Sequence, residues 1–471
     1  MRRLAGLILP TVAALAALLH PSPAHASGPA LGIADDHVLL GGGAAAEEAV
    51  KSWAGLGVQQ VRVTAMWNQI APSARSKSRP KGFDAANPAS PGYKWAALDG
   101  AVDLAKANGI QPIVLITGPG PYWASRFPSH RRGTYYPSPS AFRSFAKAVA
   151  LRYGDRVDTY ILWNEPNLAA WLSPQAKCRK HHGCTAVAPH VYRNLVRAAY
   201  PAIHAADKHA KVLIGATSSR GSTLHSASST ERPLAFLRAL GCVNSHYKKL
   251  RSGACRHFHA AKGDGYAYHP HNVLLAPNRA FPNHDDADLA SLGRVETTLD
   301  KLQHRGRLKA STHRFYLYLD EYGYQTNPPD KTAGVSLRTQ DKWLQQAGYI
   351  AWRDHRVKLF SQYLWRDDWA RTGWQSGLEF ADGKAKPALK HFANPFAMDS
   401  ARNRLWGQVR RRDASTVTVQ RRSKRSKTWR TVKRVRPDSF GYWSWHTRLS
   451  KGASYRYEAS GATSSTLKRS G

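Results

Sequence analysis

Eight runs of mainly apolar residues, each four to eight residues long, recur between residues 31 and 364, and polar segments separate them. Most of these runs are apolar throughout, which is typical of parallel strands that are buried on both faces. The strands predicted in this way are Leu31–Ala34, Val58–Ala65, Ile110–Ile116, Val157–Trp163, Val212–Gly215, Gly265–His269, Phe315–Leu319 and Val357–Leu364.

Segments with apolar residues at helical spacing lie between these runs. Strands that alternate with helices over this length predict a closed (β/α)8 TIM barrel. A doubly wound open sheet is the alternative, but no glycine-rich phosphate loop follows any of the runs, which speaks against it. The helical positions are Trp95, Leu98, Val102 and Ala105; Phe142, Phe145, Val149 and Leu151; Val191, Leu195, Ala198 and Ile203; and Leu299 with Leu302.

The pattern changes near the C-terminus, where apolar and polar residues alternate in short runs. Such alternation with a period of two predicts antiparallel strands, here a small β-sandwich. We therefore expect a barrel domain over residues 27–395 and a basic β-sandwich module over residues 396–471. The strands expected in this module are Leu405–Val409, Thr416–Gln420, Tyr442–Thr447 and Tyr455–Glu458.

Residues 1–26 have the pattern of a secretory signal peptide. Arg2 and Arg3 precede the apolar stretch Leu4–Leu19, and Ala24-His25-Ala26 forms a small-residue cleavage site. A membrane anchor is the alternative, but the stretch is short for a spanning helix and Pro10 interrupts it. We expect a secreted, extracellular protein that has no membrane segment after cleavage of the signal.

The four cysteines form two closely spaced pairs, which suits an oxidising compartment. This spacing predicts the disulfides Cys178–Cys184 and Cys242–Cys255. The first loop also holds His181 and His182, so a zinc site is the alternative there. Four ligands in so short a loop would not easily reach tetrahedral geometry, and this favours the disulfide. We expect neither a metal nor a cofactor.

The formal net charge of +38 is concentrated near the C-terminus. Residues 396–471 contain nineteen Lys and Arg against four Asp and Glu, a net charge of +15. One interpretation is a solvated, solubilising surface. The other is retention on an anionic cell-wall or extracellular polymer. Nucleic acid is not an expected partner of an exported chain.

Two glutamates stand at the ends of apolar strands. Glu165 ends the run Tyr160-Ile-Leu-Trp-Asn-Glu, and Glu321 follows the run Phe315–Leu319. The carboxyl ends of barrel strands carry the chemistry of this fold, and the fourth and seventh strands can face each other across its mouth. Two carboxylates there predict hydrolysis of a glycosidic bond, with Glu165 as acid/base and Glu321 as nucleophile of a retaining reaction. Asn164 is placed to bind a sugar hydroxyl.

The sequences Trp163-Asn164-Glu165-Pro166 and Leu319-Asp320-Glu321-Tyr322-Gly323 resemble the motifs of clan A retaining glycoside hydrolases, notably families 5 and 39. This resemblance implies the same roles for the two glutamates. It also implies that Arg62 lies beneath the nucleophile, where a cation keeps a carboxylate ionised. Trp365, after the eighth strand, corresponds to the aromatic floor under the sugar.

The sixth strand departs from the pattern of the clan. Its sequence Tyr266-Ala-Tyr-His-Pro-His resembles a His-x-Tyr segment, but His271 stands where tyrosine is usual. Either His269 keeps its role and His271 replaces the tyrosine, or Tyr268 hydrogen-bonds the nucleophile. Several aromatic residues follow strand ends, where their faces can stack on sugar rings. We expect Trp67, Trp123 and Trp365 to contact the ligand.

Together these features predict a secreted retaining glycosidase that acts on a β-linked polysaccharide or large oligosaccharide. The long polar loops and the aromatic residues favour a polymer over a disaccharide. We rank β-glucan first as the substrate, followed by xylan and mannan. The alternatives are a glycosidase on an arabinose- or uronate-containing polymer, and a non-catalytic protein that binds glycan or anionic polymer.

Overall fold

The structure is a computed structural model that describes residues 28–410 and 415–470. Eight parallel strands close into a barrel in the order β1-β14-β11-β9-β7-β4-β3-β2, so all eight predicted strands and the TIM barrel are confirmed. The predicted signal peptide lies outside the described residues. The barrel strands are β1 (Ala30–Ala34), β2 (Gln60–Met66), β3 (Gln111–Thr117), β4 (Thr159–Leu162), β7 (Lys211–Ser218), β9 (Gly265–His269), β11 (Leu317–Tyr322) and β14 (Val357–Tyr363).

Side chains alternate along each strand between the barrel interior and the helix layer. Leu115, Ile161, Ala267 and Tyr318 belong to a small buried cluster within the barrel, whereas residues such as Leu162 pack in a much larger cluster with the surrounding helices. This alternation decides which residues near a strand end can reach the mouth of the barrel.

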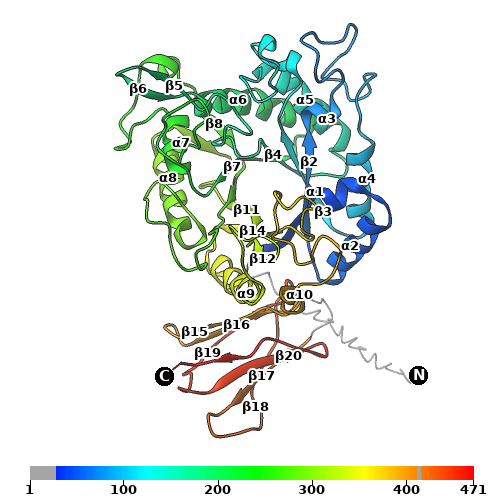
Figure 1. Ribbon diagram of the computed structural model, residues 1–471, viewed down its shortest axis with the longest axis vertical. Helices are drawn as coiled ribbons and strands as arrows, with labels where there is room; N and C mark the ends of the chain where they lie inside the picture. The colour runs from blue at the N-terminus through cyan, green and yellow to red at the C-terminus, as the bar shows by residue number, and fades with distance from the viewer. Residues whose placement is uncertain (1–27, 411–414, 471) are drawn as a thin grey trace, which may run out of the picture.

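Helices surround the strands as a ring (Figure 1). The four helical patterns found in the sequence fall on α4, α5, α6 and α8, but parts of their predicted faces are wrong. Leu151 is 47% exposed, because α5 buries Phe142, Phe145 and Val149 without it. The helices are α1 (Asp36–Gly41), α2 (Gly43–Gly55), α3 (Trp67–Ile70), α4 (Ala96–Ala107), α5 (Pro139–Tyr153), α6 (Ala188–Ala206), α7 (Pro233–Leu240), α8 (Leu292–His304), α9 (Leu337–Arg353) and α10 (Pro387–Phe392).

The C-terminal module consists of antiparallel sheets that lie beside α9 and α10 (Figure 1). Its core contains Phe396, Leu405, Val419 and Tyr457. All four predicted strands are present, but four further strands were missed, including β18, whose alternation is hidden by charged residues. The strands are β15 (Phe396–Asp399), β16 (Arg404–Gln408) and β19 (Tyr442–His446) in one sheet, and β17 (Val417–Arg422), β18 (Arg430–Val435), β20 (Ser454–Ala459), β21 (Ala462–Thr463) and β22 (Leu467–Lys468) in the other.

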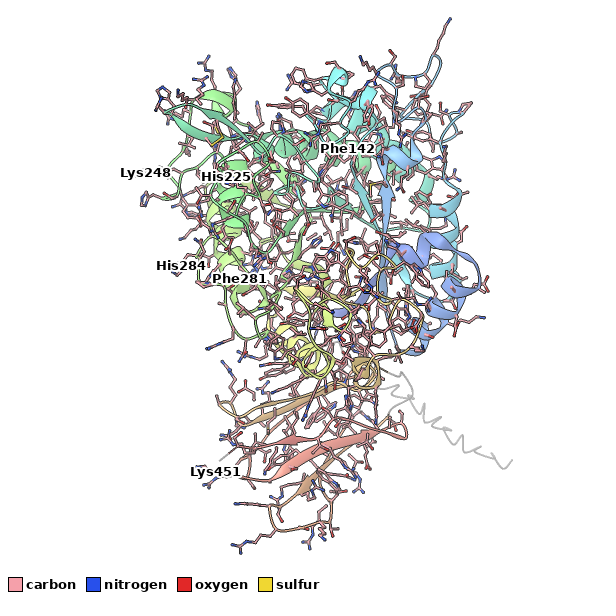
Figure 2. All side chains as sticks on the ribbon, in the orientation of Figure 1. Phe142, His225, Lys248, Phe281, His284 and Lys451 are labelled. Carbon is pink, nitrogen blue, oxygen red and sulfur yellow. A yellow bond between two sulfur atoms is a disulfide. The ribbon has the colours of Figure 1, made fainter. Side chains whose placement is uncertain are left out.

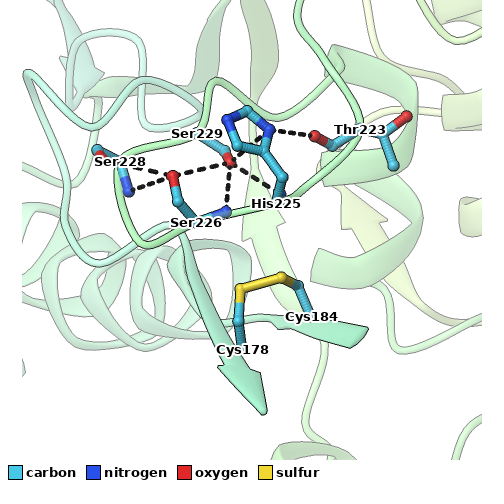
Figure 3. The surroundings of a disulfide bond; sticks show 7 residues. All are labelled: Cys178, Cys184, Thr223, His225, Ser226, Ser228 and Ser229. Atoms are coloured by element: carbon cyan, nitrogen blue, oxygen red, sulfur yellow. Dashed lines mark hydrogen bonds between the residues drawn. A yellow bond between two sulfur atoms is a disulfide. The ribbon is translucent and has the colours of Figure 1, made fainter. Parts of the chain in front are cut away.

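Both predicted disulfides are present. The disulfide between Cys178 and Cys184 joins the short antiparallel strands β5 (Ala176–Arg179) and β6 (Gly183–Ala186). The alternative zinc site would need both of these sulfurs as thiolate ligands, so the structure contradicts it. The backbone N–H of Gln175, just before β5, donates to the carbonyl of Ala227 at 2.8 Å. This bond ties the hairpin to the loop over residues 223–229, shown beside it in Figure 3.

The other disulfide, Cys242–Cys255, closes the segment between α7 and the strand β8 (Ala261–Gly263). Short pairs β8 with β10 (Leu308–Ala310), and β12 (Thr326–Asn327) with β13 (Val335–Ser336), lie outside the barrel sheet. Within the described residues, no helix has both the length and the apolar composition that crossing a bilayer requires.

Candidate active site

Glu165 lies in a turn after β4 whose backbone is unusual. Trp163 and Glu165 both have positive φ, at 73° and 32°, a conformation that side chains other than glycine rarely adopt. Two hydrogen bonds hold the turn: the N–H of Asn164 donates to Thr117 Oγ1 at 3.0 Å, and that of Glu165 donates to the carbonyl of Ala216 at 2.8 Å. Strained backbone of this kind is characteristic of functional sites.

Glu321 lies within β11, next to another buried acid, Asp320. In a regular strand these neighbours would point in opposite directions. The pairing of β11 with β14 shifts between Leu319 and Tyr322, where three steps on β11 match two on β14. Such a bulge redirects side chains, and both carboxylates reach the same guanidinium group, that of Arg62.

His269, at the end of β9, joins the two glutamates. Its Nδ1 lies 3.1 Å from Glu165 Oε1 and 3.4 Å from Glu321 Oε2. The distance between those two oxygens therefore cannot exceed the sum of these lengths, 6.5 Å. Retaining glycosidases place their carboxyl groups ~5–5.5 Å apart and inverting ones roughly 6.5–9.5 Å apart, so this upper limit leaves room for the retaining arrangement and favours it over the wider inverting one.

Arg62 and Asp320 complete a buried charge network behind Glu321. Arg62 Nη1 donates to Glu321 Oε1 and, at 3.3 Å, to Asp320 Oδ2. The same Asp320 oxygen lies 3.2 Å from His269 Nε2. On the other side of the guanidinium, Asp36 Oδ2 lies 4.0 Å from Arg62 Nη2. Sequence reasoning assigned no role to Asp320, although an acid inside an apolar strand is costly unless it is paired.

This network fixes the charges of its members. Burial alone would raise the pKa of Glu321, but the cations of His269 and Arg62 hold it well below its usual range. Burial alone would lower the pKa of His269, but Glu321 and Asp320 raise it to about 10. At neutral pH Glu321 is thus ionised and His269 is protonated, so that both of its ring nitrogens donate.

Some polar atoms at this site have no partner within the described residues. Asn164 is buried, and its side-chain oxygen makes no hydrogen bond there. One oxygen of Asp320 is in the same situation. A buried polar atom is costly unless it is satisfied. The carboxamide of Asn164 is therefore available to a ligand hydroxyl, which remains the role that the sequence predicts for it.

His271 lies next to Glu321, as the first of the two alternatives for the sixth strand expects, but the aromatic residues beside it are not the predicted ligand contacts Trp67, Trp123 and Trp365. His271 Nε2 lies 3.6 Å from Glu321 Oε2, and the His271 ring lies 5.0 Å from the ring of Trp374. Tyr363, the last residue of β14, lies 5.5 Å from Trp374 and beneath the guanidinium of Arg62. Trp374 is 38% exposed. These positions make Trp374 and Tyr363 the better candidates for contact with a sugar.

Three predicted ligand contacts are wrong, because their side chains are buried away from the mouth. Trp67 packs between Phe142, labelled in Figure 2, and Phe145, at 5.6 and 5.5 Å. Trp365 packs edge-on against Trp53 in the helix layer. Tyr268 donates its hydroxyl hydrogen to the carbonyl of Ala287, on the outer side of β9.

Trp123 is half-buried, and its indole N–H donates to the carbonyl of Pro72 at 3.0 Å. It therefore braces the loop after β2. By contrast, Arg62, Glu165, His269 and Glu321 converge at the mouth as the sequence predicted, and Asn164 directly precedes Glu165 in the turn after β4.

No family model matches the chain. A curated β-glucosidase from Agrobacterium sp. (strain ATCC 21400) is 32% identical over 128 residues, which cover 25% of this chain and 23% of that protein. The chain thus spans less than a quarter of the length of this curated relative.

Among solved structures, a family 39 glycoside hydrolase from Bacteroides cellulosilyticus WH2 is similar with a TM-score of 0.51, at 13% identity, over 92% of this chain and 81% of that chain. A family 39 β-xylosidase from Caulobacter crescentus has a TM-score of 0.47, at 15% identity, over 86% of this chain and 84% of that chain. The chain shares with the first of these structures the fold of a family 39 glycoside hydrolase, a closed barrel followed by antiparallel sheets.

Proposed function

We propose that this protein is a retaining glycosidase that hydrolyses a β-linked glycan, with Glu165 as general acid/base and Glu321 as nucleophile. The observation that carries the proposal is the position of His269 Nδ1 between the two carboxylates. It holds them at a separation that suits a double displacement. The two glutamates also have unequal surroundings, because Glu321 pairs with Arg62 and Glu165 does not, and two different catalytic roles require such a difference.

In the first step, Glu321 attacks the anomeric carbon while Glu165 donates its proton to the leaving oxygen. The bond from the carboxylate to carbon forms as the glycosidic C–O bond breaks, which leaves a glycosyl-enzyme intermediate and a free alcohol. Arg62 and His269 keep Glu321 ionised for this attack. Asn164 offers its unpaired carboxamide oxygen to a hydroxyl of the same sugar.

In the second step, the ionised Glu165 takes a proton from water as that water attacks the anomeric carbon. The ester bond to Glu321 breaks, and the sugar leaves with the configuration it had in the substrate. Because Glu165 must exchange protons with both water and the leaving group, its greater exposure than that of Glu321 suits this role.

The test is release of reducing sugar from β-glucan, xylan, mannan, arabinan and uronate polymers, with Glu321→Gln as the blank. We expect the unmodified protein alone to act on at least one of them. The anomer released first is then identified by proton NMR, and we expect retention. An inverted product, or equal activity of the Glu321→Gln variant, contradicts the proposal.

We also propose that the protein is secreted. Two closed disulfides support this location, as does the signal pattern of residues 1–26. N-terminal sequencing of exported protein should find a chain that begins at Ser27.

A second proposed role is binding of the C-terminal module to an anionic polymer. Residues 421–436 contain nine Lys and Arg and no acid. Arg421 and Arg430 lie directly opposite each other on β17 and β18, an arrangement that costs stability. The ring of Trp429 lies 4.8 Å from the guanidinium of Arg422 and 4.4 Å from that of Arg456. The aromatic ring thus holds two cations on the surface.

The test removes three charges from the hairpin turn in the full chain, by Lys424→Gln, Arg425→Gln and Lys427→Gln. We expect this variant to elute from an immobilised anionic cell-wall polymer at lower salt than the unmodified protein, since such contacts are screened within about 8 Å at physiological salt. Elution at the same salt concentration contradicts this second role.

A further inference from the structure

The loops around the mouth of the barrel differ in charge from one half to the other. The loops after β2, β3 and β4 cover residues 66–95, 118–138 and 163–187, and we call them the β2–β4 rim. They contain eleven Lys and Arg against two Asp and Glu, a net charge of +9. These three strands are neighbours in the barrel, so the charge lies on one side of the mouth.

The facing half has the opposite charge. The strands β9, β11, β14 and β1 are also neighbours in the barrel. The loops that follow these four strands contain six Lys and Arg and ten Asp and Glu, a net charge of −4. A basic composition that served only solubility would not be divided in this way. These loops cover residues 270–291, 323–336, 364–386 and 35–42.

The cations of the two halves also differ in their partners. On the facing half, Lys386 pairs with Asp367 at 2.7 Å and Arg366 with Glu379 at 2.8 Å. In the part of the chain that the structure describes, none of the eleven cations of the β2–β4 rim has an acidic partner. All eleven are exposed. Their charges are free to engage a ligand.

The three loops of the β2–β4 rim form one connected surface. The N–H of Tyr122, in the loop after β3, donates to the carbonyl of Ala74 in the loop after β2, at 2.8 Å. The loop after β4 is joined through Ser173, whose N–H donates to the carbonyl of Thr134 and whose carbonyl accepts from the N–H of Tyr136, both at 2.8 Å. The three loops that carry these cations are therefore tied to one another through their backbones.

Aromatic rings stand among these cations. Phe127 is 44% exposed and lies 5.2 Å from Tyr136, and His130 lies 4.2 Å from Tyr135. The same loop carries Arg126, Arg131 and Arg132. Aromatic faces stack on the apolar faces of sugar rings, and a guanidinium binds a carboxylate or sulfate through two parallel hydrogen bonds. The combination suits a sugar chain that carries negative charge.

We propose that the glycan bound at this site is acidic, bearing carboxylate or sulfate groups, and that it crosses the β2–β4 rim with these groups on Arg126, Arg131 and Arg132. The inference rests on the proposed glycosidase function for the reaction, but its binding surface is separate from the two glutamates. A neutral glycan would gain nothing from a set of unpaired cations that repel one another.

The experiment measures binding to the full chain carrying Glu321→Gln, so that hydrolysis does not interfere. The probes are oligosaccharides of hyaluronan, which carries carboxylates, of chondroitin 4-sulfate, which adds sulfate, and of neutral mixed-linkage β-glucan. The rim variant is Arg126→Gln, Arg131→Gln and Arg132→Gln. The matched control removes the same charge from the facing half, by Arg279→Gln, Lys331→Gln and Arg371→Gln.

We expect the rim variant to raise the Kd of an acidic probe about 3- to 100-fold in 50 mM NaCl, as the loss of three exposed ion pairs implies. The effect should shrink in higher salt, and the control should change Kd less than about twofold. Equal binding of hyaluronan and chondroitin 4-sulfate identifies carboxylate as the recognised group, and binding of the sulfated probe alone identifies sulfate. Either result supports the proposal.

Several results overturn it. These are a failure of both acidic probes to bind, an equal loss in the rim and control variants, and a loss confined to the Lys424, Arg425 and Lys427 variant of the C-terminal module. Hydrolysis of neutral β-glucan with a kcat/KM that the rim substitutions leave unchanged also overturns it. If the rim binds an acidic probe but the chain with Glu321 intact cleaves no glycan, the glycosidase proposal fails while the rim assignment stands.

Discussion

Glu165 and Glu321 are the same side chain at the ends of two barrel strands, yet their surroundings differ. Glu321 lies among Arg62, His269 and His271, and its side chain is 8% exposed. Glu165 meets His269 at one oxygen and is 17% exposed. A nucleophile needs a fixed charge, whereas an acid/base needs access to protons. The neighbours of each glutamate, and not its residue type, therefore divide the two roles.

We expect the largest losses of activity when either glutamate is replaced. The two roles can then be told apart by comparing substrates whose leaving groups do or do not need a proton. We expect Glu321→Gln to lose at least about 10⁴-fold in kcat on every substrate, because no covalent intermediate can form. Glu165→Gln should lose about 10²- to 10⁴-fold on a glycan. On a dinitrophenyl glycoside, whose leaving group departs without a proton, its kcat/KM should fall much less, because kcat/KM reports the first step and not the second step, in which Glu165 activates water. Release of dinitrophenolate, followed by absorbance, gives the measurement.

Glu379→Gln is a suitable control, since Glu379 pairs with Arg366 outside the charge network. The assignment of roles is reversed if Glu321→Gln is the variant that the activated glycoside rescues. It fails altogether if the activated glycoside rescues both variants equally.

The next largest loss of activity is expected when Arg62 is replaced, the cation that pairs with Glu321 and not with Glu165. We expect Arg62→Met to lower kcat by about 10²- to 10³-fold, as loss of a buried electrostatic contact does in other active sites. Arg62 lowers the pKa of Glu321, so its removal should raise that pKa and move the acid limb of the kcat/KM profile to higher pH. An acid limb at the same pH in the folded variant contradicts this role.

Stability should depend on pH through His269. Its pKa is about 10 in the folded protein against an ordinary 6.5. The group therefore stabilises the fold fully below about pH 6.5, and this contribution disappears as pH rises toward 10. We expect His269→Gln to cost on the order of 3 kcal/mol at pH 6 and progressively less at higher pH. Chemical unfolding from pH 6 to 10 measures it, and a cost that stays constant contradicts the expectation.

The fold was predictable because its strands are buried on both faces, so that apolar runs such as Ile110–Ile116 mark them directly. The convergence of Glu165 and Glu321 followed from their places at the ends of the fourth and seventh strands. Strand β18 was missed because it lies at the edge of a sheet, where four of its six residues are exposed and the apolar alternation is weak.

The directions in which individual side chains point were harder to predict from the sequence. Counting along a strand cannot reveal the bulge that brings Asp320 and Glu321 to one guanidinium. It also cannot say which way the chain turns after a strand ends, and Trp365 turns back into the helix layer. Trp374 stands ten residues beyond Leu364, where the predicted strand ends, and only the folded loop brings its ring next to His271.

The smallest expected effect on activity compares these two tryptophans. We expect Trp374→Ala to raise KM about 2- to 12-fold with little change in kcat, since a stacking contact is worth about 0.5–1.5 kcal/mol. Trp365→Ala should instead leave KM unchanged and lower the free energy of unfolding by about 3–5 kcal/mol, because it opens a cavity beside Trp53. Steady-state kinetics and denaturant unfolding of both variants measure these effects. If Trp365→Ala raises KM in a fully folded protein while Trp374→Ala does not, the assignment of the sugar contact to Trp374 is wrong. Trp365 is then the aromatic residue that contacts the sugar, as the sequence predicts.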